Sequence, residues 1–158
     1  MLFLLFQIGH DRYALDARHA VEVIPFLALK KIPQAPRGVA GLFNYRGRPI
    51  PAVDLCELAL ERPARELLST RIIVVHFTDD AGSAQWLGLI AERATGTLRR
   101  DEKEFVEPGV KVGGAPYLGP VVMDAQGVIQ LLHVQHLLAH NLRELLLAET
   151  RVLTHEAD

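Results

Sequence analysis

The stretch GLFNYRGRPIPAVDL, residues 41–55, joins an apolar run, an Arg-Gly pair and two prolines that stand one residue apart. Backbone N–H groups at alternate strand positions point to the same side, so Pro49 and Pro51 remove donors from one edge and leave the other free to pair. This segment is therefore predicted to be an edge strand, or a strand beside a loop. Gly47 tolerates the positive φ that the preceding turn needs, which holds Arg46 at the rim of a hairpin.

Composition places the chain among ordinary globular proteins. It has 158 residues, of which 49% are hydrophobic and 23% charged, and its formal net charge of -2 gives no overall attraction to nucleic acid or anionic lipid. A single cysteine, Cys56, excludes an internal disulfide and a cysteine-rich zinc site, and it fits a reducing compartment such as the cytoplasm. The apolar start has no basic lead-in and is too short to span a bilayer, so we interpret it as a buried strand.

Short apolar runs between turn signals predict a mainly β protein. Residues 2–53 contain about five such runs, and residues 70–134 repeat this organisation with different sequences. Between them, Asp54 and Glu57 form a capping-box pattern for a short helix, and a charged connector broken by Pro63 follows.

The end of the chain has helical periodicity, which predicts a helix over about residues 133–155. Within it, Leu145, Leu146 and Leu147 are consecutive and cannot all be buried on one narrow helix face. Residues 141–158 are therefore expected to place apolar surface either against the rest of the protein or against another chain, by self-association.

The opening stretch resembles the most recognisable motif of CheW-like domains, Asn-Leu-Arg-Gly followed by Pro-x-Val-Asp-Leu. The run FLLFQIGHDRYALDARHAVEVI is similar to the start of such domains, and the resemblance continues through RIIVVHF, WLGLIAERATGTL, YLGPVVMD and GVIQLLHVQHLL. It covers roughly residues 2–139. Two departures are that Tyr45 replaces the usual leucine and that Arg37-Gly38 stand where a bulkier residue is common.

The resemblance implies a single CheW-like domain over residues 1–158. Its fold would be two five-stranded SH3-like β-barrel subdomains packed together, with short helices and a C-terminal helix. Subdomain 1 would span about residues 1–60, and subdomain 2 about residues 66–132. The C-terminal helical segment would follow at about 133–155.

The function implied by the resemblance is that of a non-enzymatic adaptor. It would couple chemoreceptors, the methyl-accepting proteins, to a CheA-like histidine kinase in a bacterial chemosensory array. The receptor's cytoplasmic tip would enter the groove between the subdomains, and the kinase's regulatory domain would engage their exposed ends. The adaptor would be cytoplasmic and recruited to membrane-associated arrays, with no cofactor, no nucleic-acid partner and no direct membrane insertion.

Site residues follow from the motif position by position. The motif arginine is Arg46, and the groove-side acidic residue is Glu22. The positions that the resemblance assigns to the receptor groove are Arg46, Glu22, Ala20, Gly41, Asn44 and Tyr45, whereas Gly47 has a structural role in the turn. From chemistry alone a solvated turn arginine is the simpler interpretation, because single surface arginines are common. The match to the motif favours partner binding instead.

A metal site is the alternative function. His133, His136 and His140 follow at spacings of three and four and could share a helix face as imidazole ligands. Zinc would need a fourth ligand, and no cysteine or acidic residue stands within the set. Surface or capping histidines at the start of a helix are the competing interpretation.

Enzyme and nucleic-acid functions have little support in the sequence. Ser69 and Ser83 lack a nucleophile-elbow context, and no glycine-rich loop opens a helix. Lys30-Lys31 and Arg99-Arg100 are the only basic pairs, and neither is interleaved with the aromatic residues that a single-strand binder would need.

Overall fold

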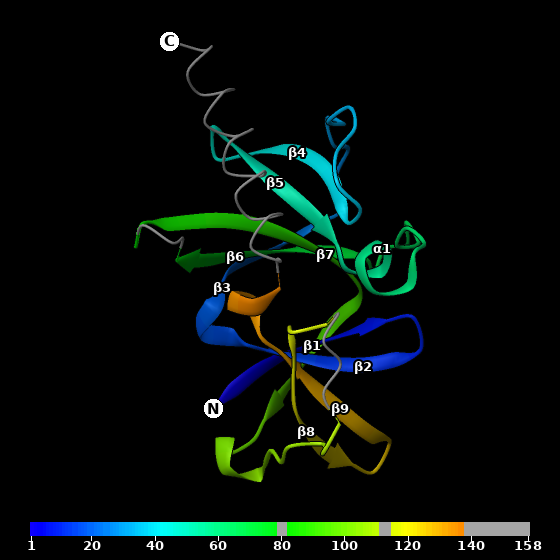
Figure 1. Cartoon of the computed structure of the whole chain (residues 1–158), viewed down its shortest axis with the longest axis vertical. Coiled ribbons are helices and arrows are strands. Elements are labelled where there is room, and N and C mark those ends of the chain that lie inside the picture. The colour runs from blue at the N-terminus through cyan, green and yellow to red at the C-terminus, as the bar shows by residue number, and fades with distance from the viewer. Residues whose placement is uncertain (79–81, 111–114, 138–158) are drawn as a thin grey trace.

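A computed structural model describes residues 1–78, 82–110 and 115–137 as a mainly β structure with few helices (Figure 1). The strands of these residues are β1 (Leu2–Ile8), β2 (Asp11–Asp16), β3 (Ala20–Pro25), β4 (Val39–Tyr45), β5 (Arg48–Asp54), β6 (Arg71–Thr78), β7 (Ala84–Arg99), β8 (Leu118–Asp124) and β9 (Gly127–Leu132). The helical elements are α1 (Leu55–Leu60) and the 3₁₀ turns η1 (Ala17–His19), η2 (Glu102–Glu104) and η3 (Val134–His136). The mainly β class predicted from the sequence is confirmed.

Local signals explain where several elements begin. Gly9, with φ of 65°, turns β1 back into β2. Asp54 caps α1, because its Oδ1 accepts the backbone N–H groups of Cys56 at 2.9 Å and Glu57 at 3.3 Å.

No helix in the described part of the chain is long and apolar enough to cross a membrane.

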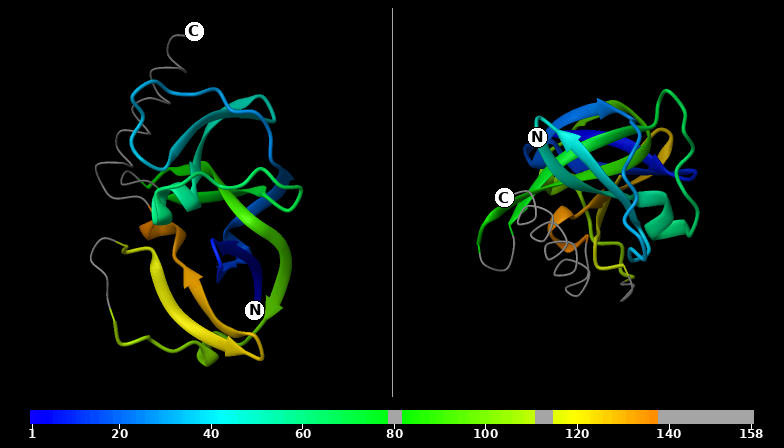
Figure 2. Two further views of the ribbon diagram at one scale, coloured as in Figure 1. Left: turned by 90° about the vertical axis from the view of Figure 1, so that its right-hand side faces the viewer. Right: turned by 90° about the horizontal axis from the view of Figure 1, so that it is seen from above.

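The strands form two five-stranded halves that share β7. We call them the β4 half, in the order β4-β5-β7-β6-β3, and the β8 half, in the order β7-β1-β2-β9-β8. Residues 84–91 of β7 pair with β6, and residues 92–99 pair with β1. The strand passes between the halves beside Arg93, whose φ is 47°. Figure 2 shows β7 curving from one half into the other.

The strand pairing differs from the predicted architecture in one respect. Within the described residues no ladder joins β3 to β4 or β8 to β7, so each half is an open sheet and two closed barrels are not confirmed. The strands β1 and β2 pair with β7 and β9, late in the chain, and the subdomain bounds of about residues 1–60 and 66–132 stay a prediction. Periodicity finds strands but carries no information about their partners.

The prediction of an edge strand after the Arg-Gly pair is correct for only part of β5. The strand pairs with β4 along its length, but with β7 only from Ala52 to Asp54. Pro49 and Pro51 lie before that second ladder begins, where a missing N–H group costs no interstrand bond.

One apolar core lies between the halves. Its buried side chains come from both, with Phe6 and Leu15 from the β8 half and Ile73 and Leu89 from the β4 half. Each half also has a smaller cluster of its own, one around Phe43, Ile50 and Ile72 and the other around Phe3, Ala14, Val122 and Ile129. Of the predicted C-terminal helix, about residues 133–155, the described residues contain only the short turn η3. Residues 138–158 lie outside the described residues.

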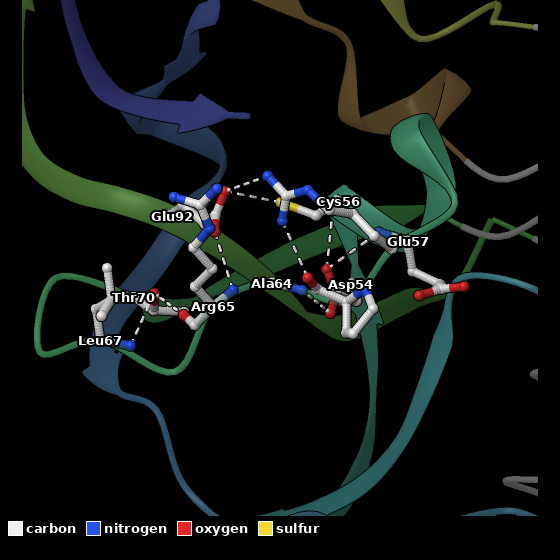
Figure 3. A network of polar contacts seen from close by, with 10 residues as sticks. Asp54, Cys56, Glu57, Ala64, Arg65, Leu67, Thr70 and Glu92 are labelled. Atoms are coloured by element: carbon white, nitrogen blue, oxygen red, sulfur yellow. Dashed lines mark hydrogen bonds and ion pairs between the residues drawn. The ribbon is translucent and has the colours of Figure 1, made fainter. Parts of the chain in front are cut away.

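Glu92 is buried where β7 changes halves, at 5% exposure (Figure 3). Its carboxylate accepts hydrogen bonds from the Arg65 backbone N–H at 2.9 Å, from Arg62 Nη2 at 3.2 Å and from Cys56 Sγ at 3.3 Å. Burial alone would raise the pKa of Glu92, but these bonds outweigh it and lower the pKa to about 2. Burial, reinforced by the bond to Glu92, raises the pKa of the Cys56 thiol to about 12.

A second buried carboxylate, Asp54, holds the connector between α1 and β6. Its Oδ2 accepts the Ala64 backbone N–H at 2.8 Å. Farther along the connector, the Thr70 hydroxyl donates to the Arg65 carbonyl and accepts the Leu67 N–H at 3.4 Å. Side chains thus provide hydrogen-bond partners for a segment that has no regular structure, as buried backbone requires.

Replacing Glu92 with Gln should lower the free energy of unfolding at neutral pH by about 2 kcal/mol, because a buried charge-assisted network is lost. The pKa of Glu92 is depressed from 4.5 to about 2, so its contribution is complete above about pH 4.5 and is lost as pH falls toward 2. Urea denaturation at several pH values should therefore show a flatter acid dependence in Glu92→Gln than in the wild type.

Asp124→Asn is the matched control. Its carboxylate also has a pKa lowered to about 2, by the side-chain hydrogen bond from Arg12, but it lies at the β8–β9 turn. In the double variant, the changes in unfolding free energy caused by Glu92→Gln and Asp124→Asn should add, because the two sites share no partner. Identical acid dependence in Glu92→Gln and the wild type would show that folding does not lower the pKa of Glu92.

Candidate functional site

The motif arginine lies at the tip of the β4–β5 hairpin. Arg46 and Gly47 form a two-residue turn with φ of 51° and 83°, the positive values that a type I′ turn requires. Asn44 Oδ1 accepts the Gly47 backbone N–H at 2.8 Å and closes the turn. The Arg46 side chain is 66% exposed, so the turn presents its guanidinium to solvent.

Glu22 connects this hairpin to β3. Its Oε1 accepts hydrogen bonds from the Tyr45 hydroxyl at 2.6 Å and from Arg46 Nη2 at 2.7 Å. The bond to Glu22 raises the pKa of the Tyr45 phenol. The Arg46 guanidinium carbon also lies 5.1 Å from the centre of the Tyr45 ring. These side chains link β3 and β4, between which the described residues have no ladder.

This ion pair positions groups rather than stabilising the fold. Both side chains are well exposed, at 66% for Arg46 and 39% for Glu22. Exposed pairs of this kind contribute about 0–1 kcal/mol. What they do provide is one fixed orientation of a surface guanidinium.

Two further residues extend the site in a way that the sequence interpretation missed. The Trp86 ring of β7 lies 5.6 Å from the Tyr45 ring in an edge-on arrangement. The Arg48 guanidinium carbon lies 4.6 Å from the centre of the Trp86 ring. We call Glu22, Tyr45, Arg46, Arg48 and Trp86 the arginine–aromatic cluster. A two-residue turn places Arg48 opposite Tyr45, and this could have been predicted from the motif. No local sequence signal predicts that Trp86 lies beside them.

Ala20 and Gly41 have other surroundings. Ala20 packs against the core between the halves, and a bulge separates it from Glu22. At Gly41 the chain comes close to Lys30, since an added Cβ would lie 2.4 Å from the Lys30 carbonyl oxygen. Lys30 and Leu42 exchange two backbone hydrogen bonds of 2.8 Å beside it. Both positions thus have packing roles, and their predicted partner contacts stay predictions.

Of the histidines of the alternative function, His133 directly precedes η3 and His136 is its last residue. The rings of His133 and His136 are 5.8 Å apart, and burial, with a contribution from His136, lowers the pKa of His133. They line a hollow of about 600 Å³ together with Glu107 and Gln130. His140 lies outside the described residues, and within those residues no three His, Cys, Asp or Glu side chains are placed to hold a metal ion. The metal-site alternative gains no support.

Comparison with known proteins gives a consistent result. The family model of the CheW-like domain matches residues 2–142. A chemotaxis protein CheW of Helicobacter pylori is 28% identical over 97 residues, which cover 61% of this chain and 56% of that protein. A chemotaxis protein CheW of Treponema pallidum is 25% identical over 139 residues, covering 84% and 78%. The match therefore spans little more than half of the first relative's length.

The fold has a counterpart among solved structures. The crystal structure of the scaffolding protein TtCheW from Thermoanaerobacter tengcongensis is similar, with a TM-score of 0.76. Sequence identity is 24%, and the alignment covers 89% of each chain.

Two substitutions at the hairpin turn should differ in their effect on stability. Gly47→Val should destabilise the protein by about 1–2 kcal/mol, because a β-branched residue is strained at φ of 83°. Apart from its chain neighbours, no atom of the described residues lies within 4 Å of the added Cβ, so this cost comes from the backbone. Arg46→Asn should leave stability within about 0.5 kcal/mol, since Asn-Gly suits a type I′ turn. Urea denaturation measures both, and a Gly47→Val protein as stable as the wild type would contradict the turn.

Proposed function

The chain belongs to the CheW-like domain family, and from this membership we propose that it is a non-enzymatic adaptor coupling chemoreceptors to a histidine kinase. The observation that carries the proposal is the family match over residues 2–142, which contains the whole hairpin motif. Its relatives are described as chemotaxis proteins, and its structural counterpart as a scaffolding protein. A scaffold acts through surfaces, and the arginine–aromatic cluster is such a surface.

We place the cytoplasmic tip of the chemoreceptor at this cluster. The Arg46 guanidinium is exposed but already oriented by Glu22 and Tyr45, so binding would cost less side-chain entropy than at a free arginine. Asn44 and Gly47 support the receptor contact by fixing the turn. Ala20 of β3 and Gly41 of β4 are proposed as receptor contacts from the family motif alone.

The regulatory domain of the kinase is the second proposed partner, bound at the exposed ends of the two halves. Figure 1 shows β4 and β5 at one end of the molecule and β8 and β9 at the other, and the kinase would bind at these ends outside the Arg46 turn that contacts the receptor. Each half has its own apolar cluster, which supports two barrel-like subdomains as the finer architecture. The adaptor would work in the cytoplasm at membrane-associated receptor arrays, without binding nucleic acid. Self-association through the C-terminal helical segment, residues 141–158, is a further proposal.

Coupling predicts that this protein raises the activity of a partner kinase only when receptor is present. Receptor arrays and kinase from the same organism would be reconstituted with and without the purified protein, and phosphate incorporation into the kinase would be followed. We expect a higher rate with all three components and no phosphorylation by the adaptor alone. Equal rates with and without the protein would refute the coupling function.

Charge reversal at Arg46 tests the receptor surface. Arg46→Glu should weaken binding of a receptor-tip fragment by about 2–5 kcal/mol, because a paired interfacial charge is replaced by a repulsive one. Its melting temperature should stay close to that of the wild type, since the lost ion pair is exposed.

The double variant Glu22→Arg with Arg46→Glu is the matched control. It restores an internal ion pair but reverses the charge at the tip. Binding should remain weak if Arg46 contacts the receptor directly. Full rescue by the double variant would show that Arg46 only orients Glu22.

A further inference from the structure

Arg48 differs from the motif arginine in that the described residues provide no anionic partner for it. Arg46 forms an ion pair with Glu22, whereas the described residues contain no ion pair or hydrogen bond of the Arg48 guanidinium. Arg48 is nevertheless exposed, at the first position of β5. Its guanidinium carbon lies 4.6 Å from the centre of the Trp86 ring.

The stacking leaves Arg48 ready for a planar acceptor. A guanidinium on an aromatic face is attracted by the ring and keeps its N–H edge outward. That edge matches a carboxylate in a bidentate arrangement, which a lysine ammonium cannot provide. The platform is itself fixed, because Trp86 packs on the apolar cluster of the β4 half and against the Tyr45 ring.

The charges of the cluster indicate where an acidic group would bind. Glu22 offsets the charge of Arg46 and would repel a carboxylate on the β3 side. Arg48 lies on the β5 side, where the described residues place no carboxylate against it. An acidic side chain of a partner that approaches on the β5 side is therefore drawn to Arg48, while Arg46 remains the proposed contact at the hairpin turn.

We propose that Arg48, stacked on Trp86, is a second partner-binding arginine that receives an aspartate or glutamate side chain of the chemoreceptor tip. The inference rests on the proposed function, because it assigns a contact within the same binding surface. It adds the chemistry of recognition: the tip presents a carboxylate on the β5 side of the hairpin. The Arg48–Trp86 pair thereby sets the register of the tip against the Arg46 turn.

Calorimetric titration tests this contact, with the purified hairpin tip of a chemoreceptor from the same organism as the probe. Arg48→Gln should weaken binding about tenfold, the effect of removing one desolvated charge-assisted pair. Arg48→Lys should recover only part of this loss, because it keeps the charge without the planar fork. Trp86→Phe should also weaken binding, since it leaves a poorer platform for the cation.

Arg99→Gln is the matched control. It removes the same charge from an exposed arginine, at the end of β7 in the β8 half. We expect its affinity to equal that of the wild type. A tenfold loss of affinity in this control as well would show that the effect of Arg48→Gln comes from the change in net charge, and it would overturn the proposal.

The partner side of the contact is found by neutralising the acidic residues of the tip one at a time, Asp to Asn and Glu to Gln. One of these changes should weaken binding to the wild type and have little further effect on Arg48→Gln, the result of a direct pair in a double-mutant cycle. If every acidic position weakens both proteins equally, Arg48 has no carboxylate partner and the inference fails.

The outcomes separate this inference from the function on which it rests. Absence of binding between the wild type and the receptor tip contradicts the proposed function itself. Wild-type binding together with unchanged affinity in Arg48→Gln contradicts only the role of Arg48. A lower melting temperature with unchanged affinity assigns Arg48 to folding and likewise overturns the inference.

Discussion

The buried carboxylate of Glu92 is the interaction on which the arrangement of the two halves depends. A charge at 5% exposure is tolerated only when its hydrogen-bonding capacity is filled, and Glu92 has donors from α1 and from two points of the connector. It lies in β7 directly before Arg93, where the strand leaves one half and enters the other. The same group therefore fixes the crossing strand and the segment that runs beside it (Figure 3).

The shared strand also positions the candidate site. Ala52 pairs with Gly88, and a Cβ at Gly88 would lie 2.5 Å from Phe43 Cε1, so a glycine there lets the hairpin pack closely on β7. That close packing brings Trp86 beside Tyr45. The crossing that Glu92 supports and the surface at the hairpin tip are thus built on one strand.

At the surface, aromatic rings and one carboxylate organise two arginines without adding much stability. Arg46 is bound by Glu22 and lies over Tyr45, while Arg48 lies over Trp86. Exposed contacts of this kind contribute little to folding but reduce the freedom that binding must remove. Such an arrangement suits the adaptor function that we propose.

The sequence by itself determined the mainly β class, the turn at Arg46-Gly47 and the cap of α1 by Asp54, because each depends on a few neighbouring residues. The family motif also selected Glu22 and Arg46, which the structure brings together. Only the tertiary structure decided that β7 serves both halves, that Glu92 binds the connector and that Trp86 lies beneath Arg48. These features join residues far apart in the chain, and strand periodicity is the same whichever partners the strands take.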